Sequence, residues 1–287
     1  MDRIVKKAYA KINPVLDVLC RREDGYHELR MIMQTVNIYD TLELLKTESG
    51  IRLTCDTGLL PCDDGNIVYR AARLVQETFS LKEGIEIHLS KNIPMAAGMA
   101  GGSADAAATL HGMNELFELN LTTEQLCGLG VKLGADVPYC VMGGTMLAEG
   151  IGEKLTALPP MPECKLVVAK PDFDVSTKYV YENLHANDLK DHPDVDGMIA
   201  AITAGDLKAV ALHMENVLET VTVQKYPQIE ELKAFMRECG ALNALMSGSG
   251  PSVFALFTET QAAEKCATGI REKGLAGQVF VTDFQRM

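Results

Sequence analysis

Residues 94–109 read PMAAGMAGGSADAAAT, a glycine-rich turn that runs directly into an alanine-rich segment. Glycine has no Cβ, so the backbone N–H groups of such a turn can approach a ligand closely. The alanines predict a helix over residues 104–117, and Ser103 can cap its start. A helix N-terminus presents unpaired N–H groups and a partial positive charge. The stretch therefore predicts an anion site built from a strand, a loop and a helix.

A simpler explanation of this stretch is that its small residues only let the helix pack tightly on a sheet. The turn contains no lysine, and G-x-x-x-x-G-K-[ST] occurs nowhere in the chain, so it is not a P-loop. Its glycine spacing also differs from the G-x-G-x-x-G of dinucleotide-binding folds. The stretch itself does not distinguish tight packing from phosphate binding, so we consider other segments of the sequence.

The first of these segments is AYAKINPVLDV at residues 8–18, which belongs to a run over residues 4–20 that is rich in β-branched residues and predicts a strand. Lys11 and Asn13 are two residues apart and therefore project from the same face of that strand. An ammonium group beside an amide suits a substrate hydroxyl or a carboxylate. The alternative is an edge strand that carries solvated polar residues.

The second segment is GADVPY at residues 134–139, where Asp136 lies between a predicted helix end and Pro138. Its neighbours are mostly apolar, and a carboxylate in such surroundings needs a partner, for which Lys11 is a candidate. The alternative is a capping or turn aspartate before a proline. A third segment, MSGSGPSVFALF at residues 246–257, lies within ALNALMSGSGPSVFALF at residues 241–257, which predicts two strands joined by a glycine-rich turn. The turn is either a plain hairpin or has amides that cover phosphates.

The rest of the chain mixes strands and helices, which predicts an α+β protein. Strands are expected over residues 4–20, 29–45, 51–55, 85–94, 165–171 and 277–284, and helices over 66–79, 123–133, 177–184, 195–203, 207–218, 229–239 and 261–272. Three prolines in LPPMP at residues 158–162 mark a linker. We therefore expect two domains, residues 1–159 and residues 160–287.

The composition argues against several classes of protein. The 287 residues include 27 Lys and Arg against 39 Asp and Glu, a net charge of −12, which argues against nucleic acid or an anionic membrane as partner. No stretch approaches the roughly 20 apolar residues of a membrane span. The eight cysteines are scattered without a CxxC pair, and the histidines show no metal-binding spacing such as H-E-x-x-H. We expect a reduced, cytoplasmic protein whose thiols are buried.

AYAKINPVL, PMAAGMAGGSADAA with GADVPY behind it, and MSGSGPSVFAL resemble, in this order, the three motifs of the GHMP kinase superfamily. The resemblance implies an N-terminal domain similar to ribosomal protein S5 domain 2, a ferredoxin-like C-terminal domain and an active site in the cleft between them. Within the superfamily, RREDGYHEL and LGADVP are most similar to the kinases that phosphorylate the 2-hydroxyl of 4-diphosphocytidyl-2-C-methylerythritol, in the non-mevalonate isoprenoid pathway.

The resemblance also implies roles for single residues. Asp136 corresponds to the general base and Lys11 to its partner, with Asn13 beside them; Tyr26 and His27 match a pair that recognises cytosine, and Tyr181 matches a second stacking face. The ATP-binding residues implied are Pro94, Met95, Ala96, Ala97, Gly98, Met99, Ala100, Gly101, Gly102, Ser103, Ala104 and, as a base contact, Asn66. ATP is then the co-substrate and Mg²⁺ the cofactor, with Ser103 as the one candidate metal ligand. A small molecule that carries a cytidine diphosphate group is the expected partner of a monomer or homodimer.

Two alternatives stay open on the sequence. The chain is either another small-molecule kinase of the superfamily, of the homoserine, mevalonate or galactose type, or a nucleotide-binding regulator without catalysis. The GYH segment at residues 25–27 favours a cytosine pocket over the first alternative, and the presence of both Lys11 and Asp136 speaks against the second.

Overall fold

The computed structural model describes residues 2–286 and separates the chain into two compact units. Unit 1 comprises Met1–Ala10, Ile38–Ile93 and Ala100–Gly143, and unit 2 comprises Lys11–Asn37, Pro94–Met99 and Gly144–Met287. The long strands β1 (Arg3–Arg21) and β2 (His27–Thr47) run through both units, as the alternating apolar residues of the N-terminal segment predict. The predicted domains, residues 1–159 and 160–287, are two continuous segments, whereas each unit combines several segments of the chain. The boundary at residue 159 stays a prediction.

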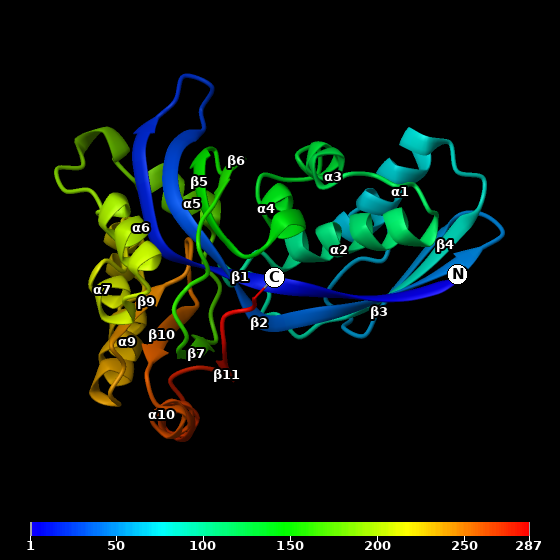
Figure 1. Cartoon of the computed structure of the whole chain (residues 1–287). Helices are drawn as coiled ribbons and strands as arrows, with labels where there is room; N and C mark the ends of the chain where they lie inside the picture. Colours follow the sequence, from blue (N-terminus) through cyan, green and yellow to red (C-terminus); the bar gives the residue numbers. More distant parts are fainter. Residues whose placement is uncertain (1, 287) are drawn as a thin grey trace. The chain divides into compact units, whose positions relative to one another are not determined.

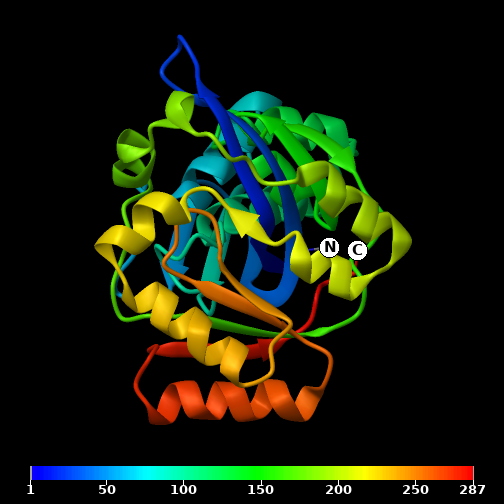
Figure 2. The same cartoon turned by 90° about the vertical axis from the view of Figure 1, so that its left-hand side faces the viewer.

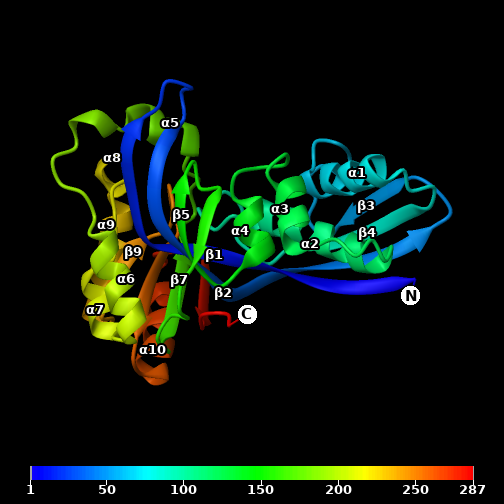
Figure 3. The same ribbon diagram turned by 45° about the horizontal axis from the view of Figure 1, so that its top comes forward.

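Unit 1 is built on a β-α-β segment. Strand β3 (Ile51–Cys55) is followed by helix α1 (Ile67–Phe79) and strand β4 (Gly84–Ser90), and β3 and β4 pair in parallel, with Leu53 opposite Ile87. Strand β4 also pairs with β2 in antiparallel register. Helix α2 (Gly101–Leu116) packs beside α1 over one face of these strands (Figures 1 and 3). Helices α3 (Thr123–Gly130) and α4 (Val137–Met142) complete the unit.

The small residues of α2 let the helix lie very close to the sheet. A Cβ built on Gly112 would lie 2.8 Å from Cδ2 of Leu44 on β2, and Ala104, Ala106, Ala107 and Ala108 of the same helix are buried. Close packing on the sheet therefore accounts for the alanines in the body of the helix. It does not account for the glycines in the turn before the helix.

Unit 2 contains a four-stranded antiparallel sheet in the order β11-β7-β10-β9. Its strands are β7 (Lys165–Lys170), β9 (Asn243–Met246), β10 (Val253–Phe257) and β11 (Gln278–Thr282), all of which the sequence predicts. Helix α9 (Gln228–Glu238) packs against β9 and β10, and α10 (Thr260–Glu272) against β7 and β11 (Figure 2). Numbered along the chain, the strand order is 4-1-3-2 with β-α-β-β-α-β connections, which confirms the ferredoxin-like expectation.

The remaining elements of unit 2 follow the prediction less closely. Strands β5 (Thr145–Gly150) and β6 (Lys154–Ala157) extend the sheet from β2, and neither was predicted. Helices α5 (Thr177–Asn183) and α6 (Val195–Ala204) and the 3₁₀ turn η1 (Ala186–Asp188) lie between β7 and residue 205. The helix predicted over residues 207–218 is wrong beyond its first turns, since α7 (Leu207–Leu212) ends early and a short strand β8 (Glu215–Asn216) precedes α8 (Glu219–Lys225).

The structure also bears on the cysteines and on membrane spans. All eight cysteines are free thiols, but only Cys266 is buried and Cys62 is exposed, so the expectation of buried thiols is wrong for most of them. Among residues 2–286, no helix is both long enough and apolar enough to cross a membrane.

Candidate active site

The glycine-rich turn has a backbone conformation that suits an anion. Ala96, Gly98 and Ala100 have φ angles of 50°, 69° and 53°, so every second residue adopts the left-handed region. Alternation of right- and left-handed residues turns successive N–H groups toward one concave side, a geometry that binds anions. For the two alanines this conformation is strained, and strain of this kind concentrates at functional sites.

The start of α2 differs from the expectation that Ser103 caps it. The helix begins at Gly101, its N-cap residue is Ala100, and no side chain caps it. Because an anion site at a helix start needs the first N–H groups to be available, an uncapped start fits such a site better than a capped one. Ser103 lies in the first turn and is half-buried.

Lys11 and Asn13 meet as predicted. Nζ of Lys11 donates to Oδ1 of Asn13 at 2.5 Å and to the carbonyl oxygen of Gly98 at 3.1 Å. Both side chains are buried in unit 2, and Nδ2 of Asn13 contacts the sulfur of Met31 at 3.4 Å. The pair is therefore not a solvated edge of a sheet, and its ammonium group is held at the glycine-rich turn.

The third motif contacts the same carbonyl group. Oγ of Ser247 donates to the carbonyl oxygen of Gly98 at 3.0 Å, so this oxygen accepts from Ser247 and from Lys11. A Cβ built on Gly98 would lie 2.1 Å from the carbonyl oxygen of Ser247, and one built on Gly248 would lie 3.5 Å from Nζ of Lys11. The segment at residues 246–250 is thus more than a hairpin, because it lies against the glycine-rich turn.

Asp136 belongs to unit 1, and its pairing with Lys11 stays a prediction. It is the N-cap residue of α4, with Pro138 in the first turn, but its carboxylate makes no capping hydrogen bond. The alternative role as a helix cap therefore does not occupy its side chain. The carboxylate is half-buried and keeps its acceptor capacity for another group.

His27 and Tyr181 come together in unit 2, although 154 positions separate them. Their ring centroids are 5.1 Å apart, with the rings tilted by 40°. Nε2 of His27 is buried and has no hydrogen-bond partner among residues 2–286. Burial lowers the pKa of His27, and the charge of Arg21 lowers it further, so both effects favour the neutral imidazole. Tyr26 is 60% exposed.

Asn66 has a structural role that the sequence did not assign. Its Oδ1 accepts from the backbone N–H of Val68, which makes it the N-cap of α1, and its Nδ2 donates to the carbonyl oxygen of Pro61 at 2.8 Å. The side chain is 6% exposed. Its contact with a nucleotide base stays a prediction.

Unit 1 contains a buried cluster of three charged side chains, and two of them come from the segments just before and just after the glycine-rich turn in the sequence. Nζ of Lys91 donates to the carboxylates of Asp40 and Asp105, the latter at 2.7 Å. Asp40 also accepts from the backbone N–H groups of Asn92 and Ile93, at 2.5 and 2.8 Å. Burial raises the pKa of Asp105 well above its usual value; the charge of Lys91 opposes this and that of Asp40 adds to it. The cluster ties the end of β4 to the second turn of α2, the two ends from which the turn extends.

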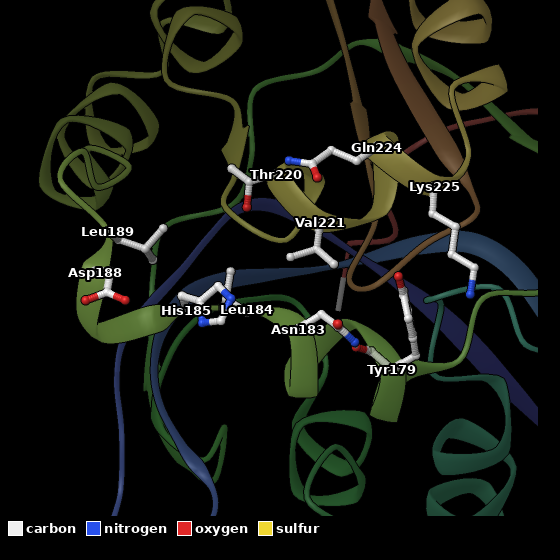
Figure 4. A pocket seen from close by; sticks show the side chains of 10 residues that line it. All are labelled: Tyr179, Asn183, Leu184, His185, Asp188, Leu189, Thr220, Val221, Gln224 and Lys225. Atoms are coloured by element: carbon white, nitrogen blue, oxygen red, sulfur yellow. The ribbon is translucent and has the colours of Figure 1, made fainter.

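A pocket of about 590 Å³ lies between α5, η1 and α8 (Figure 4). Nζ of Lys225 lies 3.7 Å from the ring centroid of Tyr179, so the two helices are linked across one end of the pocket. None of the residues that the sequence singles out lines it. The predicted site residues therefore do not belong to this pocket.

Within residues 2–286, no group of three or more His, Cys, Asp or Glu side chains could hold a metal ion. Mg²⁺ is often held by one or two protein carboxylates with water and ligand oxygens completing its shell, so this result does not test the predicted Mg²⁺ site. Ser103 lies in the first turn of α2, and its role as a metal ligand stays a prediction.

Comparison with known proteins agrees with this geometry. Residues 66–144 match the family model described as GHMP kinases N terminal domain, and residues 198–275 match GHMP kinases C terminal. The first match contains the glycine-rich turn and Asp136, and the second contains the third motif. The chain belongs to the GHMP kinases.

Individual GHMP kinases are similar over the whole chain. A 4-diphosphocytidyl-2-C-methyl-D-erythritol kinase of Lachnospira eligens is 54% identical over 284 residues, which cover 99% of each protein. A crystal structure of 4-(cytidine 5'-diphospho)-2C-methyl-D-erythritol kinase is 32% identical, with a TM-score of 0.85 over 99% of this chain and 100% of the other. A homoserine kinase from Cytophaga hutchinsonii is 25% identical, with a TM-score of 0.76 over 98% and 95%.

Sequence reasoning missed several side chains that hold this GHMP kinase site together. The notable ones are Ser247, Asn216 and the cluster around Lys91, each of which bonds to a segment far away in the sequence. Ser247 lies within the third motif, but nothing in the neighbouring sequence indicates that its hydroxyl contacts Gly98. For Asn216, a weak local signal is that the apolar residues Val217 and Leu218 follow it, since a polar residue beside a buried pair needs buried partners.

Proposed function

We propose that this chain transfers the γ-phosphoryl group of ATP to the 2-hydroxyl of 4-diphosphocytidyl-2-C-methyl-D-erythritol, releasing ADP and the 2-phosphate, a step of isoprenoid precursor synthesis. The observation that carries the proposal is 54% identity to a kinase of that substrate over 99% of both chains. The protein is a cytoplasmic enzyme in this proposal.

The roles of the residues follow from the chemistry of phosphoryl transfer, which depends on positioning and on stabilisation of charge. The N–H groups of residues 94–104 bind the phosphates of ATP at the uncapped start of α2. Lys11, held at Gly98 and Asn13, stabilises negative charge on the transferred group. Asp136 orients the 2-hydroxyl and accepts its proton as the new P–O bond forms and the bond to the β-phosphate oxygen breaks. Mg²⁺, with Ser103 as its protein ligand, neutralises the phosphate oxygens when bound.

The cytosine end of the substrate is assigned to unit 2. The Nε2 atom of His27 is buried and has no hydrogen-bond partner within the described residues 2–286, and a base that donates to it would satisfy that atom. The Tyr181 ring beside it offers an apolar face, which suits stacking of a base. Tyr26 is the second ring assigned to this end.

The test is ADP release in the presence of Mg²⁺, with the cytidyl substrate, mevalonate and homoserine compared in parallel. Turnover with the cytidyl substrate alone is expected, and it requires the cytosine contacts just described. Faster turnover of mevalonate or homoserine would place the chain elsewhere among the GHMP kinases. ATP binding without turnover of any of the three alcohols would support a regulator instead.

A further inference from the structure

Asn216 holds the third motif in place from inside unit 2. Its Nδ2 donates to two backbone oxygens of that motif, Met246 O and Gly248 O, each at 2.8 Å, and its Oδ1 accepts from the backbone N–H of Leu218 at 3.0 Å. The side chain is 3% exposed. The two N–H groups of the Asn216 amide therefore bind the residues immediately before and after Ser247.

The backbone at Asn216 is anchored to β1, the strand that carries Lys11 and Asn13. Strand β8 pairs with β1 in parallel, with Leu16 opposite Asn216, and the N–H of Val217 donates to the carbonyl oxygen of Leu16 at 3.0 Å. One residue therefore connects the strand of the ammonium group with the loop of the third motif. No other side chain described in residues 2–286 donates to both Met246 and Gly248.

The loop that Asn216 binds contacts the glycine-rich turn through Ser247. Ser247 donates to the carbonyl oxygen of Gly98, and the same oxygen accepts from Lys11. Displacement of Ser247 by a fraction of an ångström would alter that hydrogen bond and, through it, the position of the ammonium group. Shifts of about 1 Å at a reacting centre cost roughly 10²-fold in rate, so a buried amide remote from the substrate can matter for turnover.

We propose that Asn216 is a positioning residue, which sets the place of Lys11 at the glycine-rich turn through Ser247 and Gly98. This inference rests on the proposed function, since it assumes that Lys11 acts on the transferred phosphoryl group. Asn216 itself touches neither substrate in this proposal.

The test compares Asn216→Asp with Asn243→Asp. Asn243 is the control, because its Nδ2 also donates to a backbone oxygen, that of Ala211, at 2.8 Å, and its Oδ1 accepts from a backbone N–H. It is half-buried and lies at the end of β9 that is farther along the chain from the loop. In both variants a carboxylate oxygen replaces an amide donor, which destabilises the fold. We expect kcat to fall by roughly 10- to 100-fold in Asn216→Asp and by less than about twofold in Asn243→Asp, at matched fractions of folded protein.

Two further measurements separate positioning from general loss of structure. Hydrogen exchange of the amides at residues 247–250 is expected to be faster in Asn216→Asp than in wild type and unchanged in Asn243→Asp. The double variant with Ser247→Ala is expected to lose no more kcat than the more impaired single variant, because both changes act on one path. If Asn216→Asp does not fold, Asn216→Ser serves in its place, since it shortens the side chain without adding charge.

The outcomes are distinguishable. Equal kcat in the Asn216 and Asn243 variants, with an active wild type, overturns the positioning role and leaves the proposed function standing. Additive losses in the double variant overturn the path through Ser247. An inactive wild type overturns the proposed function, whereas the hydrogen-exchange comparison still tests the hold of Asn216 on the loop.

Discussion

Nζ of Lys11 lies 3.1 Å from the carbonyl oxygen of Gly98 and donates to it. The ammonium group is thereby attached to the backbone of the glycine-rich turn, and its hydrogen bond to the buried Asn13 side chain holds it further. A positive charge fixed at a phosphate loop needs no reorganisation when negative charge develops, and such preorganised groups are the main source of charge stabilisation in enzymes. The following predictions start from this arrangement.

Lys11→Met should reduce kcat by roughly 10²- to 10³-fold, because it removes a preorganised charge from the site of transfer. Methionine retains much of the side-chain volume, so the loss reflects charge and hydrogen bonding rather than packing. ADP release at saturating substrates measures the effect. Lys178→Met is the control, since Lys178 is exposed and pairs with the exposed Glu182 at 3.8 Å. Comparable losses in both variants would contradict the assignment.

Gly98→Ala should impair both stability and turnover. Gly98 has a φ of 69°, and its new Cβ would lie 2.1 Å from the carbonyl oxygen of Ser247. Gly205→Ala carries a similar conformational cost of about 1–2 kcal/mol at a φ of 68°, but nothing lies within 4 Å of its Cβ. Urea unfolding should therefore show a larger loss for Gly98→Ala, and only this variant should lose turnover. Equal effects would show that conformation alone, and no close approach, demands glycine at position 98.

Asp136→Asn should lower kcat by roughly 10²- to 10⁴-fold, the range for loss of a general base. Its melting temperature should match that of the wild type, because the Asp136 carboxylate makes no capping hydrogen bond that the change could remove. Asp206→Asn, at the cap of α7, alters a carboxylate that does accept backbone hydrogen bonds and should remain fully active. Wild-type turnover in Asp136→Asn would refute the role of the carboxylate.

Tyr181→Ala should raise the KM for the cytidyl substrate by roughly tenfold or more and leave the KM for ATP unchanged, because the stacking face beside His27 is lost. Tyr179→Ala is the matched control on the same helix, since its ring faces Lys225 and the pocket of Figure 4. A rise in the KM for ATP in Tyr181→Ala, or an equal effect in both variants, would argue against a cytosine contact.

Asp105→Asn should change how stability depends on pH. Burial raises the pKa of Asp105 in the folded state above the 3.8 of the unfolded chain, so the folded state binds the proton more tightly. The free energy of unfolding that this group contributes is thus greatest below pH 3.8 and falls as the pH rises through the folded-state pKa. Asparagine removes this slope while an oxygen still accepts from Lys91. Urea unfolding between pH 4 and pH 8 should show a flatter profile in Asp105→Asn, and unchanged slopes would contradict the titration of Asp105.

Local sequence determined much of this protein. Runs rich in β-branched residues, separated by turn residues, predict β1, β2 and β3. The alanine-rich segment after the glycine-rich turn predicts the helix α2, and the spacing of Lys11 and Asn13 predicts that they share one face of a strand, where they form a hydrogen bond. Each of these inferences concerns residues that are neighbours along the chain, whose relation the backbone geometry sets directly.

Only the tertiary structure decided which distant groups meet. Ser247 donates to Gly98 across 149 positions, Lys91 lies between Asp40 and Asp105, and Asn216 holds Met246 and Gly248. The predicted helix over residues 207–218 failed for the same reason, since pairing with β1 and a buried amide at Asn216 outweigh helix propensity there. Hydrogen bonds between distant segments depend on how sheets and helices pack, and periodicity along the chain carries no information about that packing.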